Sequence, residues 1–165
     1  MKKIVFGVFI VFIFYLLVWG IGELKQFVGF KYDLVKSGGN WNMYVDDDGY
    51  GYSVAMPYFL EFKGGNLSIS PSLDMNNNDD IDGDTMKELY PESALIIWLK
   101  PFNGEINELG VIITEGNMQR QVYLTDSKNA TYPDDQEYVE RHQDEINILF
   151  GKAEKMWDLK MPWGK

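Results

Sequence analysis

An apolar run near the N-terminus constrains this chain more than any other feature of its sequence. Residues 4–22 contain no charged side chain, and Lys2 and Lys3 precede them. At about 1.5 Å per residue, a helix of this length spans roughly 28 Å, which is close to the hydrocarbon thickness of a bilayer. We therefore predict a transmembrane helix over Ile4–Ile21, in a segment 1–22 that contacts the lipid bilayer through residues 4–22.

A cleaved signal peptide is the alternative interpretation of this run. The apolar part of a signal peptide usually has about 7–15 residues, so the greater length here favours a retained, single-pass signal-anchor. Gly20 and Gly22 are small residues two positions apart, which permits cleavage near Gly22 and secretion of the remainder. The short N-terminal tail predicts a domain outside the cytoplasm, held at the cell membrane, although Lys25, Lys31 and Lys36 nearly balance the basic residues across the span.

A second, shorter apolar pattern follows the run. The apolar residues recur at helical spacing and precede a Gly-Gly pair that is typical of a helix end; they are Leu24, Phe27, Val28, Leu34 and Val35. We interpret residues 23–39 as an amphipathic juxtamembrane segment and residues 40–165 as the domain that follows it. The pattern does not decide whether this segment lies on the membrane or packs on the domain.

Turn-forming dipeptides divide the middle of the chain into short runs rich in β-forming residues. Both central positions of a tight hairpin favour Gly, Asn or Asp, and four such pairs occur: Asp48-Gly49, Gly64-Gly65, Asn103-Gly104 and Gly116-Asn117. The runs between them predict about six strands, over Trp41–Asp47, Tyr50–Lys63, Asn66–Ser70, Ser93–Phe102, Glu105–Glu115 and Met118–Thr125. Pro57 indicates an edge or a bulge in the second run.

The end of the chain predicts one amphipathic helix over residues 134–158. Its apolar stripe follows steps of three and four residues through Tyr138, His142, Ile146, Leu149, Ala153 and Met156. Asp134 with Glu137 resembles a capping box at its start, and Pro162 prevents continuation at its end. The predicted fold class is therefore α+β, with an N-terminal transmembrane helix followed by an antiparallel β-meander packed against a C-terminal amphipathic helix.

The charge of the chain limits its partners. The formal charge of the 165 residues is −10, and residues beyond 22 carry 13 basic against 25 acidic side chains. Phosphate neutralisation needs clustered Lys and Arg, so this composition argues against nucleic-acid binding and favours a basic protein partner. The chain has no cysteine, which excludes disulfides, thiolate metal sites and cysteine nucleophiles.

An acidic stretch over residues 74–88 resembles part of a calcium-binding loop. Alternating oxygen-bearing side chains before a glycine turn can supply several calcium ligands, and Asn78, Asp80 and Asp82 take those positions before Gly83. A carbonyl near Asp84 and the Glu88 carboxylate are the further ligands that we predict. The match is incomplete because Leu89 stands where the loop requires a bidentate acid. A solvated acidic loop without metal is the alternative interpretation.

No catalytic motif with a specific spacing occurs in the chain, and we predict no catalytic residue. His142 is the only histidine, and its place on the apolar stripe favours a packed role. The sequence therefore predicts a membrane-tethered, acidic, extracytoplasmic binding domain, of an inhibitor or immunity type. Two alternatives remain open, namely a carboxylate-based hydrolase of cell-wall or surface glycans and a calcium-stabilised structural module.

Overall fold

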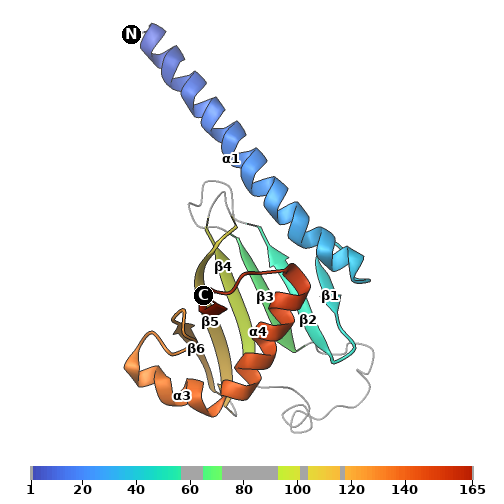
Figure 1. The fold of residues 1–165 in the computed structure, drawn as a ribbon. Coiled ribbons are helices and arrows are strands. Elements are labelled where there is room, and N and C mark those ends of the chain that lie inside the picture. Colours follow the sequence, from blue (N-terminus) through green and yellow to red (C-terminus); the bar gives the residue numbers. More distant parts are fainter. Residues whose placement is uncertain (1, 57–64, 72–92, 101–103, 116–117, 165) are drawn as a thin grey trace.

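The computed structural model describes residues 2–56, 65–71, 93–100, 104–115 and 118–164. Within them, one long helix precedes six consecutive strands, and further helices follow the strands (Figure 1). In chain order the elements are α1 (Lys2–Lys36), β1 (Met43–Val45), β2 (Tyr50–Ala55), β3 (Asn66–Pro71), β4 (Ser93–Leu99), β5 (Ile106–Glu115), β6 (Met118–Leu124), η2 (Pro133–Asp135), α3 (Gln136–Arg141), α4 (Gln143–Trp157) and η3 (Pro162–Gly164).

The six strands form one antiparallel sheet in which each strand pairs with its neighbour in the sequence, in the order β1 to β6. The first turn shows why the dipeptides are placed where they are. Gly49 has a φ of +80°, a backbone conformation that glycine adopts without a steric penalty. The Asp46 carboxylate accepts hydrogen bonds from the backbone N–H groups of Asp48 and Tyr50, which closes the turn. The β1–β2 and β5–β6 connections are short, whereas residues 72–92 separate β3 from β4.

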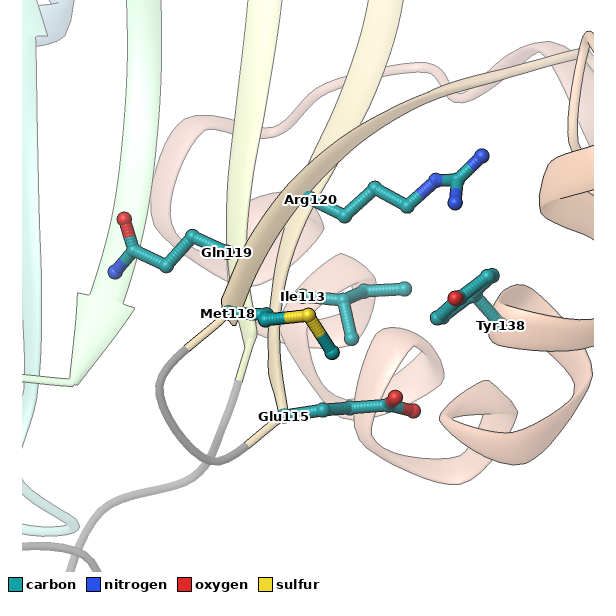
Figure 2. A pocket seen from close by; sticks show the side chains of 6 residues that line it. All are labelled: Ile113, Glu115, Met118, Gln119, Arg120 and Tyr138. Atoms are coloured by element: carbon teal, nitrogen blue, oxygen red, sulfur yellow. The ribbon is translucent and has the colours of Figure 1, made fainter.

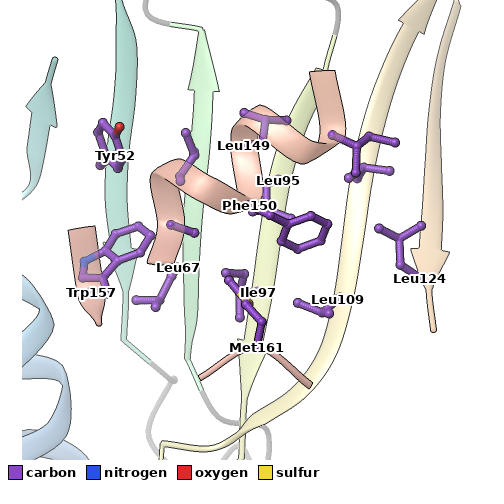
Figure 3. Close-up of a cluster of buried hydrophobic side chains, with 14 of the residues drawn as sticks. Tyr52, Leu67, Leu95, Ile97, Leu109, Leu124, Leu149, Phe150, Trp157 and Met161 are labelled. Carbon is purple, nitrogen blue, oxygen red and sulfur yellow. The ribbon is translucent and has the colours of Figure 1, made fainter. Parts of the chain in front are cut away.

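The core lies between one face of the sheet and α4 (Figure 3). In β4, Leu95, Ile97 and Leu99 are buried while Ile96 and Trp98, on the other face, are half-buried. A Cβ atom built on Gly110 would lie 2.8 Å from the Trp98 ring, so the glycine allows that ring to approach β5 closely. The helical side of the core is formed by Val139, Ile146, Leu149, Phe150, Ala153 and Trp157.

The second half of α1 packs on the domain. Phe27 and Leu34 are fully buried in the same core as the sheet residues. The Lys31 ammonium donates a hydrogen bond to the carbonyl oxygen of Trp41 at 3.2 Å and lies over the Trp41 ring. Of the two positions that the sequence pattern allowed for this segment, the structure therefore shows packing on the domain.

The predicted transmembrane helix is wrong, and the predicted signal-anchor and single-pass topology are wrong for the same reason. Among the described residues, no helix combines the length and the apolar character that crossing a membrane requires. The part of α1 over Val5–Val18 projects beyond the sheet (Figure 1), and apart from the half-buried Leu16 its large apolar side chains are 37% to 69% exposed.

The single helix predicted over residues 134–158 is also wrong. This C-terminal segment begins with the short helix η2 and then forms α3 and α4, which are separated at His142. His142 has φ −106° and ψ 15°, outside the helical region, and its ring contacts Glu115 of β5 as well as Glu145 of α4. The residue before α3 is Asp135, which makes no side-chain capping bond, so the capping box predicted from Asp134 and Glu137 is absent from this start.

Candidate functional site

A pocket of about 380 Å³ lies where the β5–β6 hairpin meets α3. Figure 2 shows its lining, in which five side chains surround the same space and Gln119 points to the other side of its strand. The lining residues are Ile113, Glu115, Met118, Gln119, Arg120 and Tyr138. Its volume falls within the range of small-molecule and side-chain binding pockets.

The strand register explains why the pocket residues share one face. Ile113 pairs with Arg120 across β5 and β6, and Glu115 pairs with Met118. Side chains two residues apart on a strand point to the same face, so these four side chains form a patch next to α3. Glu115 and Arg120 are diagonal neighbours in this patch, and such positions are about 7–8 Å apart.

The only two arginines of the chain flank Tyr138. The guanidinium carbon of Arg120 lies 4.6 Å from the centre of the Tyr138 ring, and that of Arg141 lies 4.7 Å from it. Arg120 forms an ion pair with the buried carboxylate of Asp135. Arg141 donates to Glu137 at 2.6 Å, so an acidic partner holds each guanidinium beside the ring.

Glu115 connects this pair to the histidine and keeps one oxygen free. Its Oε1 atom accepts hydrogen bonds from Nε and Nη2 of Arg141, at 3.1 Å and 2.7 Å, and lies 3.2 Å from Nε2 of His142. Its Oε2 atom has no hydrogen bond within the part of the chain that the structure describes. The hydrogen bonds from Arg141 and His142 lower the pKa of the Glu115 carboxyl group, which is therefore an anion at neutral pH.

His142 is a link between carboxylates. Its side chain is 13% exposed and lies between Glu115 and Glu145, with Nδ1 at 3.4 Å from Glu145. Glu145 in turn accepts hydrogen bonds from the backbone N–H and the hydroxyl of Ser93, at 2.9 Å and 2.7 Å. The Ser93 hydroxyl thus donates to a carboxylate, whereas an acyl-transfer nucleophile needs a hydrogen bond to its base. We interpret this chain of contacts as a positional link between β4, α4 and the β5–β6 hairpin.

Exposed carboxylates lie on η2, α3 and the start of α4, and α3 also carries the pocket residue Tyr138. They are Asp134, Glu137, Glu140 and Asp144. Both arginines, Glu115 and Glu137 are already engaged with opposite charges, so Asp134, Glu140 and Asp144 add negative charge beyond these pairs. We call these four carboxylates and the pocket together the α3 surface.

A second ion cluster holds the β1–β2 turn against α4. The Lys152 ammonium lies 2.7 Å from Asp46 and 2.8 Å from Asp48, and it faces the Tyr50 ring at 4.3 Å. The Tyr52 hydroxyl donates to the same Asp46 oxygen at 2.7 Å. Burial opposes the ionisation of Asp46, but the hydrogen bonds from Lys152 and Tyr52 outweigh it and lower the pKa of the carboxyl group. This cluster is fully engaged within the protein, so we assign it a role in stability.

The calcium ligands predicted from the sequence, Asn78, Asp80, Asp82, Asp84 and Glu88, lie outside the described residues. Among the residues that are described, no group of three or more His, Cys, Asp or Glu side chains is placed to hold a metal ion. The predicted calcium site therefore stays a prediction, as does the predicted glycan hydrolase.

The sequence pattern did not predict this site. Arg120 is on β6 and Arg141 is at the end of α3, and neither has basic neighbours in the sequence. Only the folded chain brings both to Tyr138. A usable signal was present: both arginines and the only histidine follow the Gly116-Asn117 turn, close to many acids.

No family model matches this chain, and neither a curated protein nor a solved structure resembles it. Its function is therefore inferred from its own residues and their arrangement.

Proposed function

We propose that this protein is an acidic interaction module that binds the basic face of a partner protein through the α3 surface. The observation that carries the proposal is the combination of exposed carboxylates with an open pocket. Met118, which lines this pocket, is 68% exposed and so presents an apolar side chain to a partner. A basic face would find both a complementary charge and an apolar contact here.

The residue types in the pocket support a protein partner. Tyr, Arg and Met are enriched at the centres of protein interfaces, where a few residues supply most of the binding energy. Tyr138 is held between two guanidinium groups, so little side-chain freedom is lost when a partner covers it. The surrounding carboxylates would act mainly on the rate of association and on the choice of partner. An inhibitor- or immunity-like protein would use such a surface to cover a basic enzyme.

The protein also has a region suited to lipid. Consecutive exposed side chains of Val5–Val18 are apolar and so point outward on every side of α1. A partner helix would cover only one side, whereas lipid surrounds a helix completely. We propose that this part of α1 inserts into lipid without crossing it and holds the domain on the extracytoplasmic side of the cell membrane, the side that the short Lys2-Lys3 tail favours.

The interaction proposal is tested with the full chain and a blocked lysine-rich peptide as the probe, by fluorescence anisotropy. The variant Asp134→Asn/Glu140→Gln/Asp144→Asn removes three charges from the α3 surface. A matched variant, Asp47→Asn/Glu108→Gln/Asp126→Asn, removes three exposed charges elsewhere. We expect the first variant to bind the peptide about tenfold more weakly and the second to bind nearly as the parent does. Equal losses in the two variants, or no binding by the parent, would contradict the proposal.

A further inference from the structure

We infer that the pocket of the α3 surface binds one lysine residue of the partner, with the ammonium group at Glu115 and the main-chain carbonyl or carboxylate of the same lysine at Arg120. This inference rests on the proposed function, because it names the residue that anchors the basic partner. It concerns a binding site made by five side chains from β5, β6 and α3 (Figure 2).

One polar end of the pocket can still accept a hydrogen bond, and the other end can still donate one. At one end, the Oε2 atom of Glu115 accepts no hydrogen bond from the described residues, while Oε1 already has three donor neighbours. At the other end, Arg120 pairs with Asp135 through Nη2 and also hydrogen-bonds to Tyr138, and a guanidinium has five N–H donors, so donors remain for a ligand. A ligand that carries a cation and a hydrogen-bond acceptor would satisfy both groups.

The spacing of these ends selects the ligand. Glu115 and Arg120 occupy diagonal positions on neighbouring strands, about 7–8 Å apart at the backbone. A lysine separates its ammonium group from its own carbonyl by a flexible four-carbon stem, which can bridge such a span. Between the two ends, Ile113, Met118 and the Tyr138 ring offer an apolar wall for the methylene groups.

The charge of the surroundings favours a cation at the Glu115 end. Asp135 compensates Arg120 by direct ion pairing, so the guanidinium acts toward the pocket as a hydrogen-bond donor more than as a free positive charge. Arg141 is compensated by Glu115 and Glu137. The exposed carboxylates of the α3 surface add negative potential around the mouth of the pocket.

The experiment replaces each lysine of the probe peptide in turn by norleucine, which keeps the carbon stem and removes the ammonium group. If one lysine fills the pocket, one replacement weakens binding to the full chain by about tenfold and the others have small effects. In the protein, Glu115→Gln should abolish the difference in affinity between the peptide with that lysine and the peptide with norleucine in its place. The same charge change at the other end of β5, Glu108→Gln, should leave the difference intact.

A second variant covers the case in which Glu115→Gln disturbs the fold through Arg141 and His142. Met118→Ala removes an exposed side chain and so leaves the core unchanged. It should weaken binding of the parent peptide several-fold, whereas Met43→Ala on β1 should not. Equal small losses at every lysine, with no effect of Glu115→Gln or Met118→Ala, would overturn the lysine pocket but leave the acidic surface as the binding region. Absence of binding by the parent would overturn the proposed function itself.

Discussion

Asp46 illustrates how a single carboxylate can join two layers of this domain. It closes the β1–β2 turn through backbone hydrogen bonds and also meets Lys152, which comes from α4. The side chains of Asp46 and Lys152 are each 15% exposed, so neither charge is well solvated. Removing one partner of such a pair leaves the other charge poorly compensated, and that cost exceeds the net value of the pair.

We predict that Lys152→Met lowers the free energy of unfolding by about 2 kcal/mol, because Asp46 then stays buried without its cation. The matched control is Lys155→Met, which changes an exposed lysine of the same helix. Urea denaturation of the two variants and the parent measures the difference. If both variants lose the same free energy of unfolding, the loss comes from replacing a lysine of α4 by methionine in general, and the pair with Asp46 does not explain it.

The pH dependence of stability follows from the same carboxylate. Its folded pKa is lower than the unfolded value of about 3.9, so the unfolded chain binds more protons between these two pKa values. The stabilisation by Asp46 is fully present above the unfolded pKa and is lost as the pH falls through the folded pKa. We therefore expect Asp46→Asn to lose less stability than the parent between pH 6 and pH 3 in urea titrations. Asp47→Asn, which alters the exposed neighbour, should follow the parent, and identical curves for all three proteins would contradict the assignment.

Residue-level chemistry was the part of the site least accessible from the sequence. The contacts of His142 illustrate the reason, because its partner Glu115 is 27 residues away in the chain and on a different element. Because His142 lies on the apolar stripe, the sequence pattern predicted that it packs within one helix. Its actual position at a break between helices depends on carboxylates that only the folded chain brings to it.

At the scale of elements, local signals predicted the strands well and the helices less well. Hairpin turns depend on a few adjacent residues, so the observed start of β2 at Tyr50, β3 at Asn66 and β4 at Ser93 coincides with the predicted runs. The predicted strand over residues 57–63 lies outside the described residues. Helix bounds depend on packing over longer distances, and that dependence explains the division into α3 and α4.

Helix α1 provides a test at this scale. Phe27 is fully buried and lies close enough to the sheet that a Cβ atom on Gly65 would meet its ring at 2.4 Å. We predict that Phe27→Ala lowers the free energy of unfolding by about 3–5 kcal/mol, because it leaves a cavity where α1 contacts the sheet. Tyr32→Ala is the control on the same helix, since Tyr32 is 61% exposed. A loss no larger than that of the control, in thermal or urea unfolding, would mean that α1 does not contribute to the core in solution.

At the scale of the whole molecule, the apolar part of α1 and the acidic α3 surface divide the protein into two regions of different chemistry. We predict that the full chain floats with vesicles of neutral phospholipid in a density gradient, because the exposed side chains of Val5–Val18 leave water on insertion. Val8→Lys/Phe12→Lys should remain at the bottom of the gradient. Asp134→Asn/Asp144→Asn should float like the parent, and failure of the parent to float would rule out lipid attachment through this segment.

The most direct test of the proposed function locates the bound partner on the protein. Methionines serve as reporters, because the chain has eight of them and they include Met118 at the pocket on β6 and Met43 on β1, at the opposite edge of the sheet. The full chain, labelled with ¹³C at the methionine methyl groups, is titrated with the lysine-rich peptide and followed by NMR. We predict that the Met118 signal shifts and saturates with the peptide while the Met43 signal does not move. Peptide binding that moves Met43 and leaves Met118 unchanged would contradict the α3 surface as the binding region.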